Sequence, residues 1–239
     1  MKILAFDSTA KAATAALLED DRILAEFTVD NGLTQSEVLL PMAENVCART
    51  GCSIADMDYY AVTVGPGSFT GVRIGVATVK GLAFRMPRGE ENCVGVSTLE
   101  ALAENLSSLD GILCPVMDAR RAEVYNALFR MENGVLTRLC PDRAISLEAL
   151  ADELLTLYPQ ENIRLSGDGY DIAFAALSAR GVPVLPTPFL LRTQNAASVA
   201  LCASRIVKAG GAVRDGALSP VYLRLPQAER DRLKKENNQ

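Results

Sequence analysis

Residues 65–73 read GPGSFTGVR, and the stretches on either side of them decide the fold. The stretch before them, YYAVTV, is aromatic and β-branched, which is typical of a buried strand. Residues 71–84 are almost all small or apolar and predict a helix. A strand, a glycine turn and a helix can build an anion pocket, because backbone amides converge where a helix begins. The same order also makes a plain tight turn, so two interpretations of the motif stay open.

The helix predicted over 71–84 offers too little polar surface to face water along a whole side. Its glycines, Gly75 among them, allow another backbone to approach closely. We expect its own sheet to cover one side. Either a neighbouring helix or a second protein covers the other, and the pattern leaves both open. One apolar stripe of this helix consists of Val72, Val76, Val79 and Ala83.

Composition narrows the class of protein. The chain has 239 residues, of which 49% are hydrophobic and 22% charged, so it folds around a sizeable core. The net charge is −5, and the sequence has no cluster of basic residues that could bind nucleic acid by itself. The absence of histidine excludes Ser-His-Asp and Cys-His catalysis and histidine-ligated zinc. The six cysteines form no C-x-x-C pair and no apolar run is long enough to cross a membrane, which predicts a cytoplasmic protein with reduced core cysteines.

The order of predicted elements repeats. Three strands joined by tight turns open the chain, and helices and strands then alternate; a second, similar cycle begins near residue 111. In the second cycle we expect strands at 111–117, 123–130, 134–140 and 163–166, and helices at 147–158, 173–180 and about 195–208. This duplicated βββαβαβα order predicts a two-lobed α/β fold of the actin-like and Hsp70-like (ASKHA) plan. We expect lobes at 1–105 and 106–225, with the helix at about 195–209 packing back on the first lobe and a frayed, charged tail at 226–239.

Five stretches, in order along the chain, resemble the TsaB family. They are ILAFDST (3–9), TQSEVLLP (34–41), GPGSFTGVR (65–73), MDAR (117–120) and PVYLR (220–224). The nine-residue central motif is the most specific of them. The resemblance implies a non-catalytic accessory protein in the formation of threonylcarbamoyladenosine, next to the anticodon of tRNA. It also implies an inactive relative of the catalytic protein TsaD.

The resemblance implies partners as well. The chain would form a heterodimer with TsaD, to which the ATPase TsaE binds, and would use the product of a TsaC-type synthase. Contact with tRNA would come through that complex, and the chain alone would form a homodimer. No cofactor is required by this chain, and ATP or ADP would bind only as part of the complex. The implied interface residues are Val38, Leu39, Met42 and Val46 with Val72, Gly75, Val76, Val79 and Ala83.

A vestigial nucleotide or anion loop is a second candidate site. Asp7, Ser8 and Thr9 stand where ATPases of this fold place their first phosphate loop, but Ser8 replaces the glycine that tightens that loop. With Gly65, Gly67 and Ser68 they could surround an anion. The alternative, a strand end capped by polar side chains, is favoured, because a ligand site needs several convergent groups.

Metal chemistry finds no support in the sequence. Gln35 lies in the region where TsaD carries a histidine-rich metal motif, and this chain has no histidine to put there. Two other functions stay open. One is an independent ATPase or small-molecule kinase of the same fold, and the other is a homodimeric scaffold unrelated to tRNA.

Overall fold

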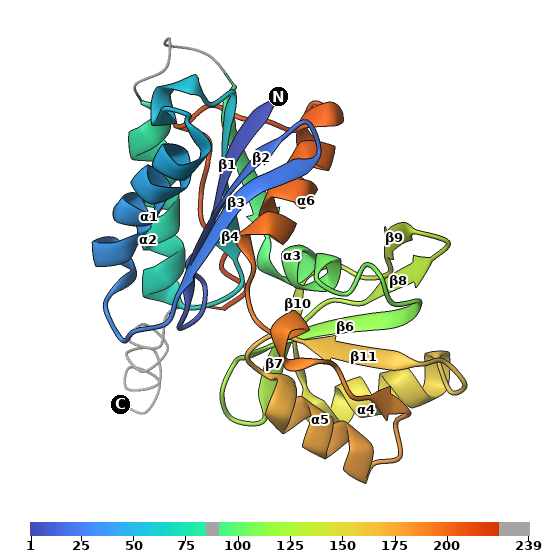
Figure 1. Ribbon diagram of the computed structural model, residues 1–239. Coiled ribbons are helices and arrows are strands. Elements are labelled where there is room, and N and C mark those ends of the chain that lie inside the picture. The colour runs from blue at the N-terminus through green and yellow to red at the C-terminus, as the bar shows by residue number, and fades with distance from the viewer. Residues whose placement is uncertain (85–90, 225–239) are drawn as a thin grey trace, which may run out of the picture.

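The first sheet begins as a three-stranded antiparallel meander, which two parallel strands extend (Figure 1). β4 pairs with β1 and β5 pairs with β4, so the strand order is β3-β2-β1-β4-β5. The computed structural model describes residues 1–84 and 91–224. The strands are β1 (Lys2–Asp7), β2 (Ala13–Glu19), β3 (Arg22–Val29), β4 (Tyr59–Gly65) and β5 (Cys93–Ser97).

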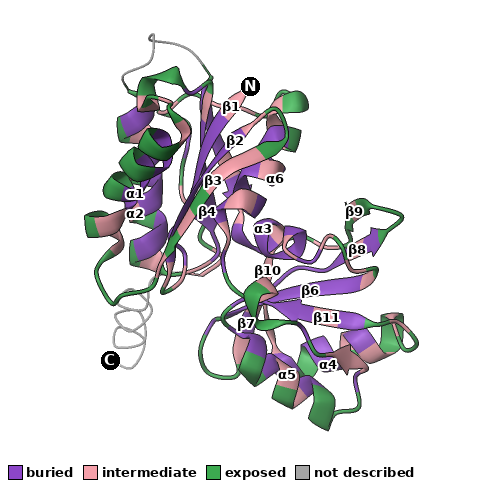
Figure 2. Ribbon diagram, in the orientation of Figure 1, coloured by how far each residue is buried: buried purple, intermediate pink, exposed green. Residues whose placement is uncertain are grey.

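Helices cover both faces of this sheet (Figure 1). Side chains alternate along a strand, so Leu4 and Phe6 of β1 point towards α1 and α2, while Ile3 and Ala5 point towards α6. Both faces of the central strands are therefore apolar and buried, as Figure 2 shows. The helices of this lobe are α1 (Gln35–Thr50), α2 (Phe69–Ala83), α3 (Thr98–Glu104) and α6 (Ala196–Lys208), with a 3-10 turn η1 (Ile54–Asp56) before β4.

The second sheet repeats the plan with shorter strands. Its order is β10-β7-β6-β11-β12, with β8 also pairing β6 and β9 lying outside β8. α4 and α5 pack against it, and η2 leads out of it towards α6 (Figure 1). The elements are β6 (Gly111–Asp118), β7 (Glu123–Asn126), β8 (Phe129–Glu132), β9 (Val135–Arg138), β10 (Arg143–Ser146), α4 (Leu147–Leu157), β11 (Ile163–Ser166), α5 (Tyr170–Ala179), β12 (Val184–Leu185) and η2 (Phe189–Leu191).

One expected strand, 123–130, is wrong as a single element. It is two strands, β7 and β8, which pair with opposite ends of β6. Pro115 lies between the two pairings and has no amide hydrogen to donate to a ladder. Asn126, fully buried, instead donates its side-chain amide to the carbonyl oxygens of Pro115 at 3.1 Å and Ala127 at 2.9 Å. β10, which pairs with β7, was not expected at all.

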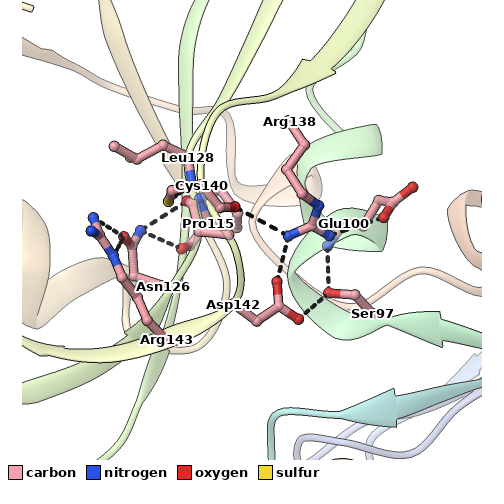
Figure 3. A network of polar contacts seen from close by, with 10 residues as sticks. Ser97, Glu100, Pro115, Asn126, Leu128, Arg138, Cys140, Asp142 and Arg143 are labelled. Carbon is pink, nitrogen blue, oxygen red and sulfur yellow. Dashed lines mark hydrogen bonds and ion pairs between the residues drawn. The ribbon is translucent and has the colours of Figure 1, made fainter. Parts of the chain in front are cut away.

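Two elements join the lobes. α6 follows the second sheet in the chain but packs on β1 and β2 of the first. α3 buries Leu99 and Leu102 against β6 and β8 of the second lobe. Figure 3 shows the polar part of this joint. There, the Arg138 guanidinium donates to Glu100 of α3 at 2.9 Å and to Asp142 at 2.6 Å.

The observed duplication of the strand and helix order confirms the two-lobed fold predicted from the sequence. The first sheet uses residues from 2 to 97 and the second uses residues from 111 to 185. The predicted tail at 226–239 lies outside the described residues. Within 1–84 and 91–224, no helix combines the length and the apolar character needed to cross a bilayer.

Candidate functional site

The central motif turns the chain from β4 into α2. Gly65 and Gly67 have φ values of +119° and +159°, which residues with a side chain rarely adopt. Ser68 is the N-cap, and its hydroxyl oxygen accepts from the amide of Gly71 at 3.2 Å. The helix begins at Phe69, two residues before the predicted start.

Gly67, just before α2, and Gly71, within it, let the helix lie directly on the loop that follows β1. A Cβ atom on Gly71 would stand 1.9 Å from the carbonyl oxygen of Ser8, and one on Gly67 would stand 2.7 Å from Cβ of Thr9. Two hydrogen bonds join the same segments: the Ser8 hydroxyl donates to the Gly71 carbonyl at 2.9 Å, and the Ser68 amide donates to the Thr9 carbonyl at 2.8 Å. The loop is thus filled by its own helix, which favours the tight-turn interpretation of the motif.

Asp7 is enclosed beneath this contact. Its side chain is 1% exposed, and Oδ1 accepts from both the amide and the hydroxyl of Thr9, at 2.7 Å and 2.6 Å. Burial raises the pKa of Asp7 to about 6, against the lowering effect of those two bonds. A carboxylate that orients metal-bound water must reach the solvent side of the cleft. Asp7 does not line the cleft described next.

A cavity of about 530 Å³ opens between the lobes, with Thr9, Gly67 and Ser68 in its wall. The second lobe lines it with both signs of charge. Asp118 and Asp168 lie there beside Arg120, and Lys11 comes from the first lobe. Burial raises the pKa of Asp168, and Oδ1 of that residue accepts from the Asp118 amide at 3.1 Å. Arg224 lines it as well, so the wall carries charges of both signs with no excess of carboxylates. Within the described residues, no three His, Cys, Asp or Glu side chains are grouped so as to hold a metal ion by themselves.

The structure separates the two faces of α1 and α2. The stripe that was expected to contact a partner faces the first sheet, so this expectation needs correction. It turns inward because its apolar side chains pack against those of β1, β2 and β4 and so leave water. Gly75 is buried too, and Val38 is partly exposed. The side chains now placed in the core, each at most 4% exposed, are Leu39, Met42, Val46, Val72, Val76, Val79 and Ala83.

The outward face of these helices is exposed in Figure 2 and mixes polar with apolar side chains. Glu44 and Arg49 of α1 and Arg73 of α2 lie on it, together with two large apolar residues. Phe84, directly after α2, is 73% exposed, and Leu40 of α1 is 45% exposed. Ala77 and Gly81, also exposed, lie on the same face of α2 as Phe84, because they are separated by three or four positions. An exposed aromatic beside small residues makes a surface that a flat partner helix could cover.

The sequence did not indicate that Tyr222 forms part of the cavity wall. The Tyr222 ring packs against the Phe69 ring at a tilt of 30°, with centroids 4.7 Å apart, and the Tyr222 hydroxyl accepts from Nε of Arg73 at 2.8 Å. The stretch PVYLR, which contains Tyr222, was among the five family-like stretches. Its spacing in the sequence does not show that it contacts Arg73, 149 positions earlier.

Comparisons with known proteins match one family model and several named relatives. A family model described as TsaD: tRNA N6-adenosine threonylcarbamoyltransferase matches residues 34–205. A Bacillus subtilis (strain 168) protein described as tRNA threonylcarbamoyladenosine biosynthesis protein TsaB is 35% identical over 147 residues, 62% of this chain and 63% of that protein. An Escherichia coli (strain K12) protein with the same description is 37% identical over 138 residues, 56% of this chain and 58% of that protein. Each match spans less than two thirds of these relatives' length.

A solved structure extends the similarity along the chain. YeaZ from Pseudomonas aeruginosa superposes with a TM-score of 0.74 at 25% sequence identity. The match covers 93% of this chain and 99% of that one. The fold described above is therefore shared by a protein of nearly the same extent.

Proposed function

The chain belongs to the TsaB family, within the wider group that the TsaD model describes, and from this we propose that it is a non-catalytic subunit in tRNA threonylcarbamoyladenosine formation. In this proposal the chain pairs with TsaD, keeps it in its active conformation and allows TsaE to bind. It requires no cofactor of its own, meets tRNA and nucleotide only through the complex, and works in the cytoplasm.

The outward face of α1 and α2 carries the proposal. Phe84 and Leu40 are large apolar side chains that stay 73% and 45% exposed in the single chain. Covering such side chains with a partner removes apolar surface from water, at about 25 cal/mol for each Å². Ala77 and Gly81 add little bulk, so a partner helix can approach closely. A second copy of this chain would cover the same face when TsaD is absent.

The closed loop after β1 supports the non-catalytic part. Asp7 is buried, and Gly67 and Gly71 pack directly on Thr9 and Ser8. The independent ATPase or kinase remains the alternative, and magnesium-dependent ATP turnover by the purified chain alone would favour it.

The test is co-purification of TsaD with Phe84→Glu. Placing a charge at the centre of an apolar interface costs several kcal/mol, so we expect binding of TsaD to fall by at least about tenfold. Leu157→Glu is the matched control, since Leu157 is 57% exposed on α4 of the other lobe, and it should bind as the wild type does. Unchanged binding by Phe84→Glu, with both variants folded, would reject this face as the interface.

A further inference from the structure

The chain after α6 returns along the first lobe. Val213 exchanges two backbone hydrogen bonds with Cys93 of β5, at 2.9 Å and 2.8 Å. Leu218 is 3% exposed in the core beneath α2. Val221 then donates its amide to the Val64 carbonyl at 2.8 Å. The segment is therefore anchored on the first lobe up to residue 221.

Tyr222 continues the anchor on α2. Its ring lies against Phe69, and the Arg73 guanidinium lies over the Phe69 ring, 3.9 Å from the centroid. Nε of Arg73 donates to the Tyr222 hydroxyl at 2.8 Å. These contacts attach the first turn of α2 to the returning chain.

Arg224 makes its contacts on the other lobe. Its Nη2 lies 2.6 Å from Oε2 of Glu123 at the start of β7, and its Nη1 donates to the Ala119 carbonyl at 3.3 Å. The Arg224 side chain is 15% exposed, so solvent weakens the ion pair less than at an open surface. Its guanidinium also lies 5.8 Å from the ring centroid of Tyr125.

We propose that residues 218–224 are an interlobe clasp, which holds the cleft at one opening and couples the start of α2 to the β6–β7 turn. Tyr222 and Arg224 are two positions apart, a span of about 7 Å between Cα atoms even when the chain is fully extended. A movement of the second lobe must therefore pull on Tyr222 or break the Arg224 contacts. Residues 221–224 also line the 530 Å³ cavity, so the clasp forms one wall of it.

The β6–β7 turn fits this task because it is held in an unusual shape. Arg120, Arg121 and Ala122 have φ values of 64°, 60° and 59°, a run that side-chain-bearing residues adopt at a cost. The Ala119 carbonyl and the Glu123 carboxylate bracket this run, and both bind Arg224. The clasp is a property of the single chain, so it holds whether or not the proposed partner binds.

Hydrogen exchange on the full chain tests the clasp with Arg224→Ala. We expect exchange to become about threefold faster or more in peptides covering 64–73 as well as 118–126, although only the second group contacts Arg224. Protection of β11 should stay unchanged, which separates opening of the clasp from unfolding. Arg214→Ala is the matched control, because that side chain is exposed in the same segment and makes no hydrogen bond or ion pair within residues 1–84 and 91–224.

Two results would overturn the proposal. One is faster exchange at 118–126 alone, which would make the Arg224 contacts local. The other is equal exchange in Arg224→Ala and Arg214→Ala. If Arg224→Ala fails to fold, Glu123→Gln removes the charge from the other side of the same ion pair and must give the same two-lobe response. Binding of TsaD is not part of the measurement, so this outcome is independent of the proposed function.

Discussion

Val76→Arg is the sharpest test of how α2 is oriented. Val76 is 4% exposed and lies in the core cluster between α2 and the first sheet. An uncompensated buried charge costs about 3–5 kcal/mol, and overpacking adds about 1–3 kcal/mol. Domains of this kind are stable by only about 5–15 kcal/mol in total. We therefore expect the variant to be largely unfolded or to unfold at a much lower urea concentration than the wild type.

Urea unfolding followed by far-ultraviolet circular dichroism is the assay, because the chain has no tryptophan to report by fluorescence. Ala77→Arg is the control on the next residue of the same helix, which is exposed. Its free energy of unfolding should stay within about 0.5 kcal/mol of the wild-type value. It should, however, lose affinity for TsaD or for a second copy of the chain. A Val76→Arg chain with wild-type stability and no partner binding would show that the stripe faces outward, and would refute the reasoning.

Three further outcomes are expected, each read from urea midpoints. Gly71→Ala should lower the free energy of unfolding by about 3 kcal/mol or more, because its Cβ would stand 1.9 Å from the Ser8 carbonyl oxygen. Gly81→Ala has open space around its Cβ and should raise the free energy of unfolding by about 0.5–1 kcal/mol. Equal effects of the two substitutions would contradict this packing. The pKa of Asp7, about 6 in the folded chain, lies above its unfolded value, so its contribution to stability increases as pH falls from about 7 to about 4. Asp7→Asn should remove this increase, and near pH 7.5 it should be more stable than the wild type by roughly 2–3 kcal/mol. If the pH dependence of stability is the same in the variant and the wild type, the buried Asp7 carboxyl is not its cause. Asn126→Ala should cost about 2 kcal/mol, since it leaves two buried carbonyl oxygens without their donor, and a loss below about 0.5 kcal/mol would contradict that role.

Local chemistry made several boundaries predictable. The capping box of Thr34 and Glu37 opens α1, and Ser97 and Ser146 cap α3 and α4. Asn133 and Gly134, both with positive φ, join β8 to β9 as the two-residue hairpin that their side chains favour. Such signals act within a few residues, so they can be read without the rest of the fold.

Features that join distant residues could not be predicted in this way. The division of 123–130 into β7 and β8 depends on which part of β6 each pairs with, and the clasp joins Arg73 to Tyr222 across 149 positions. Neither has a period or a spacing that a sequence pattern could show, because the contact forms only after both sheets exist.

The glycine motif shows the division most clearly. The sequence alone determined that residues 65–73 turn a strand into a helix with little polar surface, since backbone freedom and side-chain polarity are local properties. Only the tertiary structure decided which apolar face is buried. The Val72–Ala83 stripe packs on the first sheet, and Ala77, Gly81 and Phe84 face outward. The outward positions alternate Ala77 and Gly81 with Arg73 and Lys80, so the polar side of the helix is narrow. Packing Val72, Val76 and Val79 on the sheet removes their apolar surface from water, and this sets the rotation of the helix.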